Sequence, residues 1–459
     1  MPPLLDPSDR RPLHFVGIAG AGMSGLAELY IRQGVTVTGC DLHPEAAGDL
    51  VRLGVNVVGG HDPSHVESAR AVVVSSALPR SHPELERARE LGIPVIRRAE
   101  ALAEAVSGGA VVGIAGTHGK TTTTVMTTFA LRGAAAHATG IVGGRVGAWG
   151  GNMSYDGGEI YVVEADEYDR SFLALSPEIA VITNVEADHL DIYRDLDDIL
   201  GAFADFAGGA RGVVYAADDA GARSVPTASH AERLGYALTA PDARLRAVEP
   251  RVDGTGTRFE VELDGDRVAE VALRVPGRHN VLNALAAMGS GLLLGLPAEG
   301  LAGGLARFEG VERRFQRLGD AASITVVDDY AHHPTEIEAT LAAARSAFGG
   351  RRIVAAFQPH LYTRTRDFAS DFGKALAAAD VVLLTEIYPA RERAIPGVSA
   401  ALVADGLREA GGSAAWLGDR SELAVALARI ARPGDVVLTI GAGDITRTGP
   451  ELLGLLGAA

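Results

Sequence analysis

A glycine-rich turn at residues 113–123 contains Lys120, one of only two lysines in a chain that has forty arginines. A hydrophobic run precedes the turn and a helical pattern follows it, which is the setting of a phosphate-binding loop. In such a loop, backbone N–H groups surround phosphate oxygens, a lysine binds the outer phosphates and a threonine hydroxyl binds Mg²⁺. Five residues separate Gly113 from Gly119, where the common pattern has four, so this loop is a variant. The alternative is a glycine turn capped by threonines. The candidate ATP-binding residues are Gly116, Thr117, His118, Gly119, Lys120, Thr121 and Thr122.

Polar residues also follow two later strands of the expected sheet. Glu164 ends a strand expected at 161–164, where α/β sheets bind ligands, and it is the candidate Mg²⁺ ligand together with Thr121. For the neighbouring Glu167, an ordinary solvated surface charge is as good an interpretation as a site residue. Asp188 and His189 follow a strand expected at 179–183, and His189 is the candidate ligand of a second cation. The alternative there is a capping aspartate beside a partly buried histidine.

A second glycine-rich turn lies near the start of the chain. Residues 17–25 contain the pattern Gly-x-Gly-x-x-Gly between an expected strand and an expected helix, and Asp41 lies about twenty residues further on. This is the pattern that binds a diphosphate at a helix N-terminus and a ribose through an acid. It indicates a nucleotide diphosphate more safely than it indicates NAD.

Four further segments carry dense polar groups. Residues 277–283 open a helix, where simple N-capping is the alternative. Arg314 lies where a third α/β unit begins, and residues 328–335 follow a strand of that unit. Residues 358–366 follow another strand, and paired arginines there suit a carboxylate ligand.

The elements that must position these residues alternate between short β-type runs and helical runs, which predicts parallel α/β sheets. We expect three domains: a Rossmann-like domain at 1–105, a central phosphate-loop ATPase domain with a parallel sheet at 106–310, and a Rossmann-like domain at 311–459. Two alternating segments at 258–263 and 268–275 are expected as antiparallel strands at an edge of the central sheet.

The composition of the chain restricts the kinds of molecule that it is expected to bind. The chain has 459 residues and a net charge of −16, which disfavours a nucleic-acid partner. No run of eighteen apolar residues and no signal-peptide pattern is present, so no membrane span and a cytoplasmic location are expected. The single cysteine, Cys40, permits no disulfide within the chain. A monomer and a homodimer are both consistent with the sequence.

These motifs, in this order, resemble the Mur ligases of peptidoglycan synthesis, and among them the members that add L-alanine to UDP-N-acetylmuramate. The phosphate loop marks the superfamily. The more specific motifs are GIAGAGMSGLA at 17–27, NVEADHLDIY at 184–193, GVERRF at 310–315, DDYAHHPTEI at 328–337 and QPHLYTRT at 358–365.

The resemblance implies roles for individual residues. The first domain would bind the UDP of the sugar substrate through Gly20, Ala21, Gly22 and Met23, with Asp41, Ser75 and Ser76 near the uridine. ATP would be bound with two Mg²⁺ ions, held by Thr121 and Glu164 and by His189. Asn280 and Asn283 would lie near the adenine and Arg314 near the phosphates. Asp329 and His332 would close over ATP, while His333, His360 and Arg364 would receive the amino acid.

The implied reaction joins L-alanine to the lactyl carboxylate of UDP-N-acetylmuramate through an acyl phosphate, giving ADP and phosphate. The sequence departs from the family pattern at Leu361, where many relatives have arginine. It also lacks the lysine that several relatives carbamylate to bridge their metals, since no lysine lies between 121 and 373.

Four alternatives remain at this point. The nearest is the recycling ligase that adds a ready-made tripeptide to the same sugar nucleotide. A folylpolyglutamate-type ligase would lack this UDP-binding domain. An NAD-binding oxidoreductase with a regulatory phosphate loop, and a non-catalytic nucleotide sensor, belong to other classes.

Overall fold

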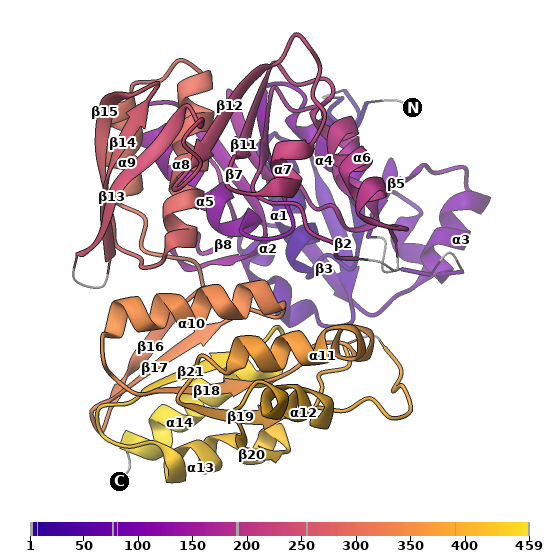
Figure 1. Ribbon diagram of the computed structural model, residues 1–459. Helices are drawn as coiled ribbons and strands as arrows, with labels where there is room; N and C mark the ends of the chain where they lie inside the picture. The colour runs from indigo at the N-terminus through magenta and orange to yellow at the C-terminus, as the bar shows by residue number, and fades with distance from the viewer. Residues whose placement is uncertain are drawn as a thin grey trace. The chain divides into compact units, whose positions relative to one another are not determined.

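The computed structural model describes residues 3–6, 8–75, 78–79, 81–189, 192–253, 256–390 and 392–457. The contacts between residues divide the chain into two compact units. The first comprises residues 1–249, 259–271 and 282–308, and the second comprises 250–258, 272–281 and 309–459. Three sheets are present: one of five and one of ten strands towards the N-terminus, and one of six strands in the C-terminal part (Figure 1).

The N-terminal sheet has the strand order β3-β2-β1-β4-β5 with all neighbours parallel, which matches the first five strands of the Rossmann order 3-2-1-4-5-6. Every residue of β1 and β4 is buried, as expected for strands that helices cover on both faces. Its elements are β1 (Leu13–Val16), α1 (Ala21–Arg32), β2 (Val37–Asp41), η1 (Pro44–Ala47), α2 (Gly48–Arg52), β3 (Asn56–Gly59), η2 (Pro63–Val66), β4 (Ala71–Val74), α3 (Pro83–Glu90), β5 (Val95–Arg97) and α4 (Arg98–Val106).

The central sheet has the order β15-β14-β13-β12-β11-β10-β6-β9-β7-β8. Its middle strand β6 runs parallel to β9 on one side and β10 on the other. The elements are β6 (Ala110–Ala115), α5 (Lys120–Gly133), β7 (Ala138–Val146), η3 (Gly147–Trp149), β8 (Gly151–Ser154), β9 (Ile160–Glu164), η4 (Tyr168–Ala174), β10 (Ile179–Ile182), α6 (Leu196–Ala207), β11 (Gly212–Ala216), α7 (Ala220–Ser224), β12 (Glu232–Ala237), β13 (Leu245–Asp253), β14 (Gly256–Leu263), β15 (Asp266–Leu273), α8 (Arg278–Leu293) and α9 (Ala298–Leu305).

The edge position expected for residues 258–275 is confirmed, because β14 and β15 end the sheet order. Only Asp264 and Gly265 connect these neighbouring strands, and so short a link joins strands that run antiparallel. On the other side of the sheet, β7 and β8 pair antiparallel with each other and contact α1 of the N-terminal sheet. The two N-terminal sheets are therefore parts of one packed unit.

The C-terminal sheet has the order β16-β17-β21-β18-β19-β20, with only β16 antiparallel to its neighbour. Alternate residues of β17 and β18 enter two separate cores, one under α10 to α12 and one under α13 and α14 (Figure 1). The elements are β16 (Gln316–Ala321), β17 (Ile324–Asp329), α10 (Pro334–Phe348), β18 (Ile353–Phe357), α11 (Tyr362–Leu376), β19 (Val381–Thr385), α12 (Ala401–Glu409), β20 (Ala414–Gly418), α13 (Arg420–Ile430), β21 (Val436–Ile440), η5 (Asp444–Arg447) and α14 (Thr448–Gly457).

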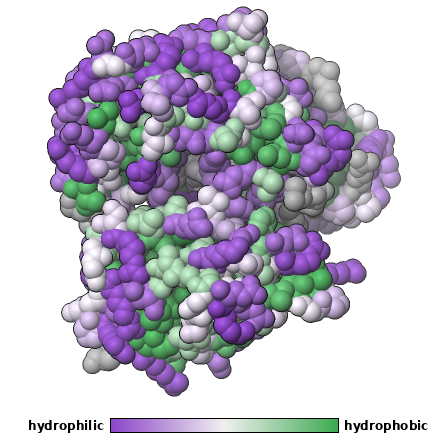
Figure 2. All heavy atoms as spheres, viewed as in Figure 1, coloured by the Kyte–Doolittle hydropathy of each residue, from purple (hydrophilic) through white to green (hydrophobic). Residues whose placement is uncertain are grey.

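The expected class, an α/β protein with a parallel sheet in each of three regions, is confirmed. Hydrophilic residues predominate on the face drawn in Figure 2. Among the described residues, no helix combines the length and apolar character needed to cross a bilayer.

Candidate functional site

The phosphate loop joins β6 to α5, as the sequence predicts. Gly119 caps the helix with a left-handed φ of 81°, and Lys120 is the first helical residue. A side chain at Gly119 would meet Asn283 Oδ1 at 2.9 Å, so this position requires glycine for both its backbone and its surroundings. The loop therefore presents a helix N-terminus at the carboxyl edge of the central strand, which is a ready anion site.

The segment after β10 holds this loop in place. His118 N–H donates to Asn184 Oδ1 at 2.8 Å, and Thr183 Oγ1 donates to the His118 carbonyl at 2.7 Å. Glu186 N–H donates to Thr117 Oγ1 at 2.9 Å. The two motifs that the sequence analysis treated separately are thus one hydrogen-bonded assembly.

Lys120 is held by a carboxylate from the segment after β9. Its Nζ lies 2.7 Å from Glu167 Oε2 and donates to the Gly116 carbonyl at 2.6 Å. Burial lowers the pKa of Lys120, but the charges of Glu167 and Asp166 outweigh it and raise the pKa above its usual value. Burial raises the pKa of Glu167, but Lys120 and the hydrogen bond from His189 lower it overall. Both groups are therefore charged, and the lysine is kept at the loop before any phosphate arrives.

Glu164 ends β9 beside the first turn of α5. Thr121 Oγ1 donates to Glu164 Oε1 at 3.0 Å, and Gly143 N–H donates to the other carboxylate oxygen at 2.8 Å. Burial raises the pKa of Glu164, and nearby Lys120 opposes that shift. A hydroxyl and a carboxylate side by side offer the oxygen ligands that Mg²⁺ prefers.

His189 lies on the other side of Glu167. Its Nε2 is 3.5 Å from Glu167 Oε1 and 3.8 Å from Asp188 Oδ2. Burial lowers the pKa of His189, but the hydrogen bond to Glu167 and the charge of Asp188 raise it overall. Its φ of 54° is unusual for a residue with a side chain, and such backbone positions cluster at functional sites. The structure brings His189 to the phosphate-loop assembly through Glu167.

The two asparagines of α8 occupy different surroundings. Thr123 Oγ1, on α5, donates to Asn283 Oδ1 at 3.1 Å, so Asn283 lies against the start of the phosphate-loop helix. Asn280 Nδ2 donates to the Pro276 carbonyl at 2.7 Å and thereby tightens the first turn of α8. This side chain donates to a carbonyl, whereas N-capping, the alternative weighed for this segment, requires a side chain that accepts from a backbone N–H.

The N-terminal glycine turn has the expected geometry. Gly20 caps α1, and Ala21, Gly22 and Met23 form its first turn. Asp41, which ends β2, accepts a hydrogen bond from Ala19 N–H at 2.9 Å. Ser75 directly follows β4, whereas Ser76 lies outside the described residues.

A cavity of about 150 Å³ adjoins this turn. It is bordered by the start of α4 and by η4, including Arg97, Arg98, Asp166 and Arg170. A side chain at Gly22 would meet Arg98 Nη1 at 2.9 Å, so the diphosphate candidate turn and the cavity share this arginine. Sequence reasoning missed Arg98, since nothing near 97–100 forms a recognisable motif.

A second polar cluster lies within the C-terminal unit. The Arg314 guanidinium sits 5.1 Å from the centre of the Tyr330 ring and 3.7 Å from Glu336 Oε1. Asp329 accepts hydrogen bonds from Phe315 N–H and Ala331 N–H, both at 2.8 Å, and burial raises its pKa to about 6. The positive charge of Arg314 opposes this rise in the pKa of Asp329, so the two groups lie near each other in this cluster.

The histidines of this cluster face the loop after β18. His332 Nδ1 lies 3.1 Å from the Tyr330 carbonyl, and burial lowers its pKa to about 4, so its ring is neutral at pH 7. The rings of His332 and His360 lie 5.9 Å apart, and His360 stacks on Tyr388. His333 instead caps α10 and packs its ring against Phe368.

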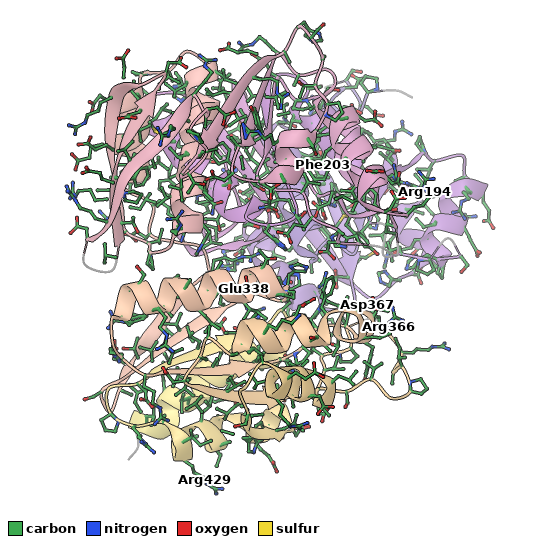
Figure 3. The ribbon with its side chains drawn as sticks, viewed as in Figure 1. Arg194, Phe203, Glu338, Arg366, Asp367 and Arg429 are labelled. Carbon is green, nitrogen blue, oxygen red and sulfur yellow. The ribbon has the colours of Figure 1, made fainter. Side chains whose placement is uncertain are left out.

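The two arginines of residues 358–366 do not act as a pair. Arg364 is 9% exposed, and its charge lowers the pKa of His332, which places it at the cluster. Arg366 is exposed and forms an ion pair with Asp367, and both are labelled on α11 in Figure 3. Only Arg364 is therefore positioned to receive a ligand there.

Two acidic residues belong to these clusters although the sequence did not single them out. Glu167 reads from the sequence as a possible surface charge, yet it is 3% exposed and bound to Lys120. Glu336 accepts hydrogen bonds from His332 N–H and His333 N–H at the start of α10. A capping pattern with glutamate three residues after the cap was the available signal for Glu336.

A phosphate loop in a parallel sheet, with carboxylates at the neighbouring strand ends, defines a nucleoside-triphosphate-dependent α/β enzyme. The chain matches the family models "Mur ligase family, catalytic domain" at residues 12–109, "Mur ligase middle domain" at 114–291 and "Mur ligase, glutamate ligase domain" at 313–443. The chain belongs to the Mur ligase family.

Individual relatives cover the whole chain. It is 46% identical to the UDP-N-acetylmuramate–L-alanine ligase of Cutibacterium acnes, over 99% of this chain and 98% of the relative. It is 43% identical to the enzyme of that name from Streptomyces avermitilis, over 99% of each chain. Among solved structures, the UDP-N-acetylmuramate–alanine ligase of Thermotoga maritima is 30% identical with a TM-score of 0.80, covering 97% of this chain and 98% of that one. A murein peptide ligase from Psychrobacter arcticus is 26% identical with a TM-score of 0.68, covering 98% and 99%.

Proposed function

We propose that this chain joins L-alanine to the lactyl carboxylate of UDP-N-acetylmuramate, with cleavage of ATP to ADP and phosphate. The observation that carries the proposal is full-length identity of 42–46% to relatives of this name, combined with an intact phosphate-loop assembly. The tripeptide-adding alternative is less favoured, because the solved murein peptide ligase is less similar in both sequence and fold.

In this proposal the ATP phosphates occupy the N-terminus of α5. The backbone N–H groups of the loop bind phosphate oxygens, and Lys120 turns from Glu167 and the Gly116 carbonyl towards the transferred phosphoryl group. Because Lys120 already carries its charge in the unliganded loop, no protonation step is required when ATP binds. The lysine supports the charge that builds up as the carboxylate attacks.

Thr121 and Glu164 fit a first Mg²⁺, since their oxygens lie 3.0 Å apart at the loop. His189, next to Asp188 and Glu167, is proposed to support a second. When bound, Mg²⁺ neutralises phosphate charge and orients the γ-phosphoryl group.

The sugar nucleotide is proposed to bind at the N-terminal turn. Its diphosphate would lie at the N-terminus of α1, with Asp41, Ser75 and Ser76 near the uridine. Arg98, which borders both this turn and the adjoining cavity, is proposed to hold an anionic group of the substrate.

The amino acid is proposed to reach the C-terminal cluster. Arg364 would bind the alanine carboxylate, with His360 beside it, and Arg314, Asp329 and His332 are proposed as catalytic residues of the same cluster. The acyl phosphate formed in the first step hydrolyses if water reaches it, so a closed site is needed before the amine attacks.

The proposal includes three domains, with boundaries at 1–105, 106–310 and 311–459. The cytoplasmic location and the choice between monomer and homodimer stay predictions from the sequence.

The test is a ligation assay on the full chain. Purified protein is incubated with ATP, Mg²⁺, UDP-N-acetylmuramate and L-alanine, and the product is weighed by mass spectrometry while phosphate is measured. We expect the UDP-N-acetylmuramoyl-L-alanine mass and one phosphate per product, with neither formed when any substrate is left out. Phosphate release without a ligated product would contradict the proposal.

A further inference from the structure

A buried cluster of metal-ligating side chains lies inside the N-terminal sheet domain, away from the phosphate loop. It gathers around Glu84, whose carboxylate is fully buried in the first turn of α3. The ligand atoms of His14, Cys40, His65 and Glu84 all lie within 4.8 Å of one another, and those of His61, His82 and Glu84 form an overlapping group. None of these residues is among those assigned above to the ligation chemistry or to the nucleotide sites.

The distances within the cluster are those of a compact coordination sphere. Cys40 Sγ lies 3.1 Å from Glu84 Oε1 and 3.2 Å from Oε2, and His65 Nδ1 lies 2.8 Å from Oε1. In a tetrahedral zinc site with bonds of about 2.0–2.3 Å, ligand atoms are about 3.3–3.8 Å apart. Shifts of a few tenths of an ångström would thus admit an ion between the groups.

Two ring nitrogens of the cluster make no protein hydrogen bond. Within the described residues, His14 Nε2 and His82 Nδ1 are buried and have no hydrogen-bond partner, although the two residues are only 1% and 8% exposed. The other nitrogen of His14 bonds Thr38 Oγ1 at 3.0 Å. If Nδ1 donates its proton there, Nε2 carries the lone pair that a metal requires, which is the usual arrangement of a ligating histidine.

His65 and Glu84 share one backbone hydrogen-bond donor. Asp62 N–H points at His65 Nδ1 and at Glu84 Oε1, each at 3.3 Å. To ligate an ion, His65 Nδ1 would turn its single lone pair from Asp62 N–H to the metal, and Glu84 Oε1 would keep the N–H donor.

We propose that His14, Cys40, His65 and Glu84 form a structural site for one Zn²⁺ ion per chain. The mixed sulfur, nitrogen and oxygen donors suit Zn²⁺ and do not suit Mg²⁺, which takes oxygen ligands. His61 Nδ1 and His82 Nδ1 lie 3.4 and 3.8 Å from the second carboxylate oxygen of Glu84, so both rings surround this carboxylate.

The charge balance of the occupied site also fits its burial. On binding, the Cys40 thiol loses its proton to solvent, while the two imidazoles stay neutral. One thiolate and one carboxylate then balance the two charges of the ion. A buried carboxylate without a cation would be costly by comparison.

The position of the site indicates what the ion would do. It would connect β1, β2, η2 and α3, which supply His14, Cys40, His65 and Glu84. Cys40 directly precedes Asp41, and its carbonyl accepts hydrogen bonds from Gly17 N–H and Ile18 N–H at the start of the glycine turn. The ion would therefore brace the N-terminal domain beside its diphosphate turn, without entering the reaction.

The test uses the full chain stripped of metal with a chelator. Zn²⁺ is titrated in competition with a chromophoric chelator, and Co²⁺ is titrated while the near-ultraviolet spectrum is recorded. We expect one tight equivalent of Zn²⁺, and a thiolate-to-cobalt charge-transfer band. Because Cys40 is the only cysteine, that band reports this site alone.

Variants then assign the ligands. Cys40→Ser should remove the band, and both Cys40→Ser and His65→Gln should weaken Zn²⁺ binding by at least about tenfold. His137→Gln, at a largely exposed histidine of the central domain, should change neither. Circular dichroism checks that each variant is folded, and the cobalt spectrum of the unmodified chain decides the question even if a variant unfolds. No bound Zn²⁺, Co²⁺ binding without the band, or unchanged affinity in folded Cys40→Ser and His65→Gln would overturn the proposal.

Discussion

Lys120 is the residue on which the ATP site depends most directly, and the chain supplies its own control. Lys120→Ala should lower ligation by on the order of 10²–10³, because it removes a charge that acts on the transition state. The only other lysine, Lys374, is exposed and pairs with Asp371 on the surface, so Lys374→Ala should leave turnover unchanged. Turnover is measured as alanine-dependent phosphate release, with circular dichroism as the folding check. A folded Lys120→Ala enzyme that turns over normally would refute the assignment of the phosphate loop.

For single residues, the proposed metal ligands also predict a change in the Mg²⁺ concentration that activity requires. Glu164→Gln and His189→Ala should each raise the Mg²⁺ concentration for half-maximal activity, since each removes a group that faces the loop or its carboxylates. Glu45→Gln and His137→Ala are matched controls, because both side chains are largely exposed. Activity is measured across a Mg²⁺ titration at saturating ATP. Identical titration curves for all four variants would show that the metals are held elsewhere.

At the scale of elements, the sequence predicted the positions of the strands better than the contacts made after them. The motifs at 113–123, 161–167 and 183–189 all follow buried hydrophobic runs, and the structure places those runs as the neighbours β9, β6 and β10. Their polar ends therefore had to meet, since parallel strands share one carboxyl edge.

The contact between Lys120 and Glu167 was not predictable in the same way. It depends on the turn after β9, where Asp169 and Arg170 both take left-handed backbone angles near 55°. Aspartate is enriched in that conformation but arginine is not, so the local sequence gives no clear signal for two such residues in a row. The ion pair between Arg366 and Asp367 was not predictable from the sequence for a related reason. The face of α11 on which each arginine lies depends on the residue at which the helix starts. Leu361 caps that helix with a φ of 69°, a backbone choice that the sequence does not announce.

The sequence of the segment after His189 predicts that activity does not depend on dissolved CO₂. Several relatives bridge their metals with a carbamylated lysine shortly after the matching histidine, and residues 190–212 contain no lysine, only Arg194 and Arg211. Arginine stays protonated and cannot carry a carbamate. Activity should therefore be the same in degassed buffer and after bicarbonate is restored at fixed pH and ionic strength. Loss of activity on degassing, with recovery on adding bicarbonate, would contradict this account of the metal site.

At the scale of the whole molecule, we propose that the C-terminal region determines which amine is accepted, because the amino-acid-binding residues are proposed to lie there. Both kinds of enzyme share the fold, as the TM-scores of 0.80 and 0.68 to their solved members indicate. Fold alone therefore does not decide the substrate. The proposal of L-alanine as substrate therefore rests on the full-length similarity to alanine ligases, and Arg364 and His360 are the side chains proposed to select it.

The corresponding prediction compares two acceptors under one set of conditions. L-alanine should support turnover far better than L-Ala-γ-D-Glu-diaminopimelate, with the difference seen in kcat/KM, because Arg364 is proposed to bind a single amino-acid carboxylate beside the histidines of this cluster. The two acceptors are offered separately and then together, with UDP-N-acetylmuramate and ATP saturating, and the products are distinguished by mass. Arg364→Lys tests the reason for the preference: it keeps the charge but loses the two parallel hydrogen bonds that arginine makes to a carboxylate, so KM for L-alanine should rise more than kcat falls. Arg366→Lys, at the exposed neighbouring arginine, should leave both constants unchanged. A higher kcat/KM for the tripeptide would identify the chain as the recycling ligase, and an unchanged KM in Arg364→Lys would move the carboxylate contact to another group.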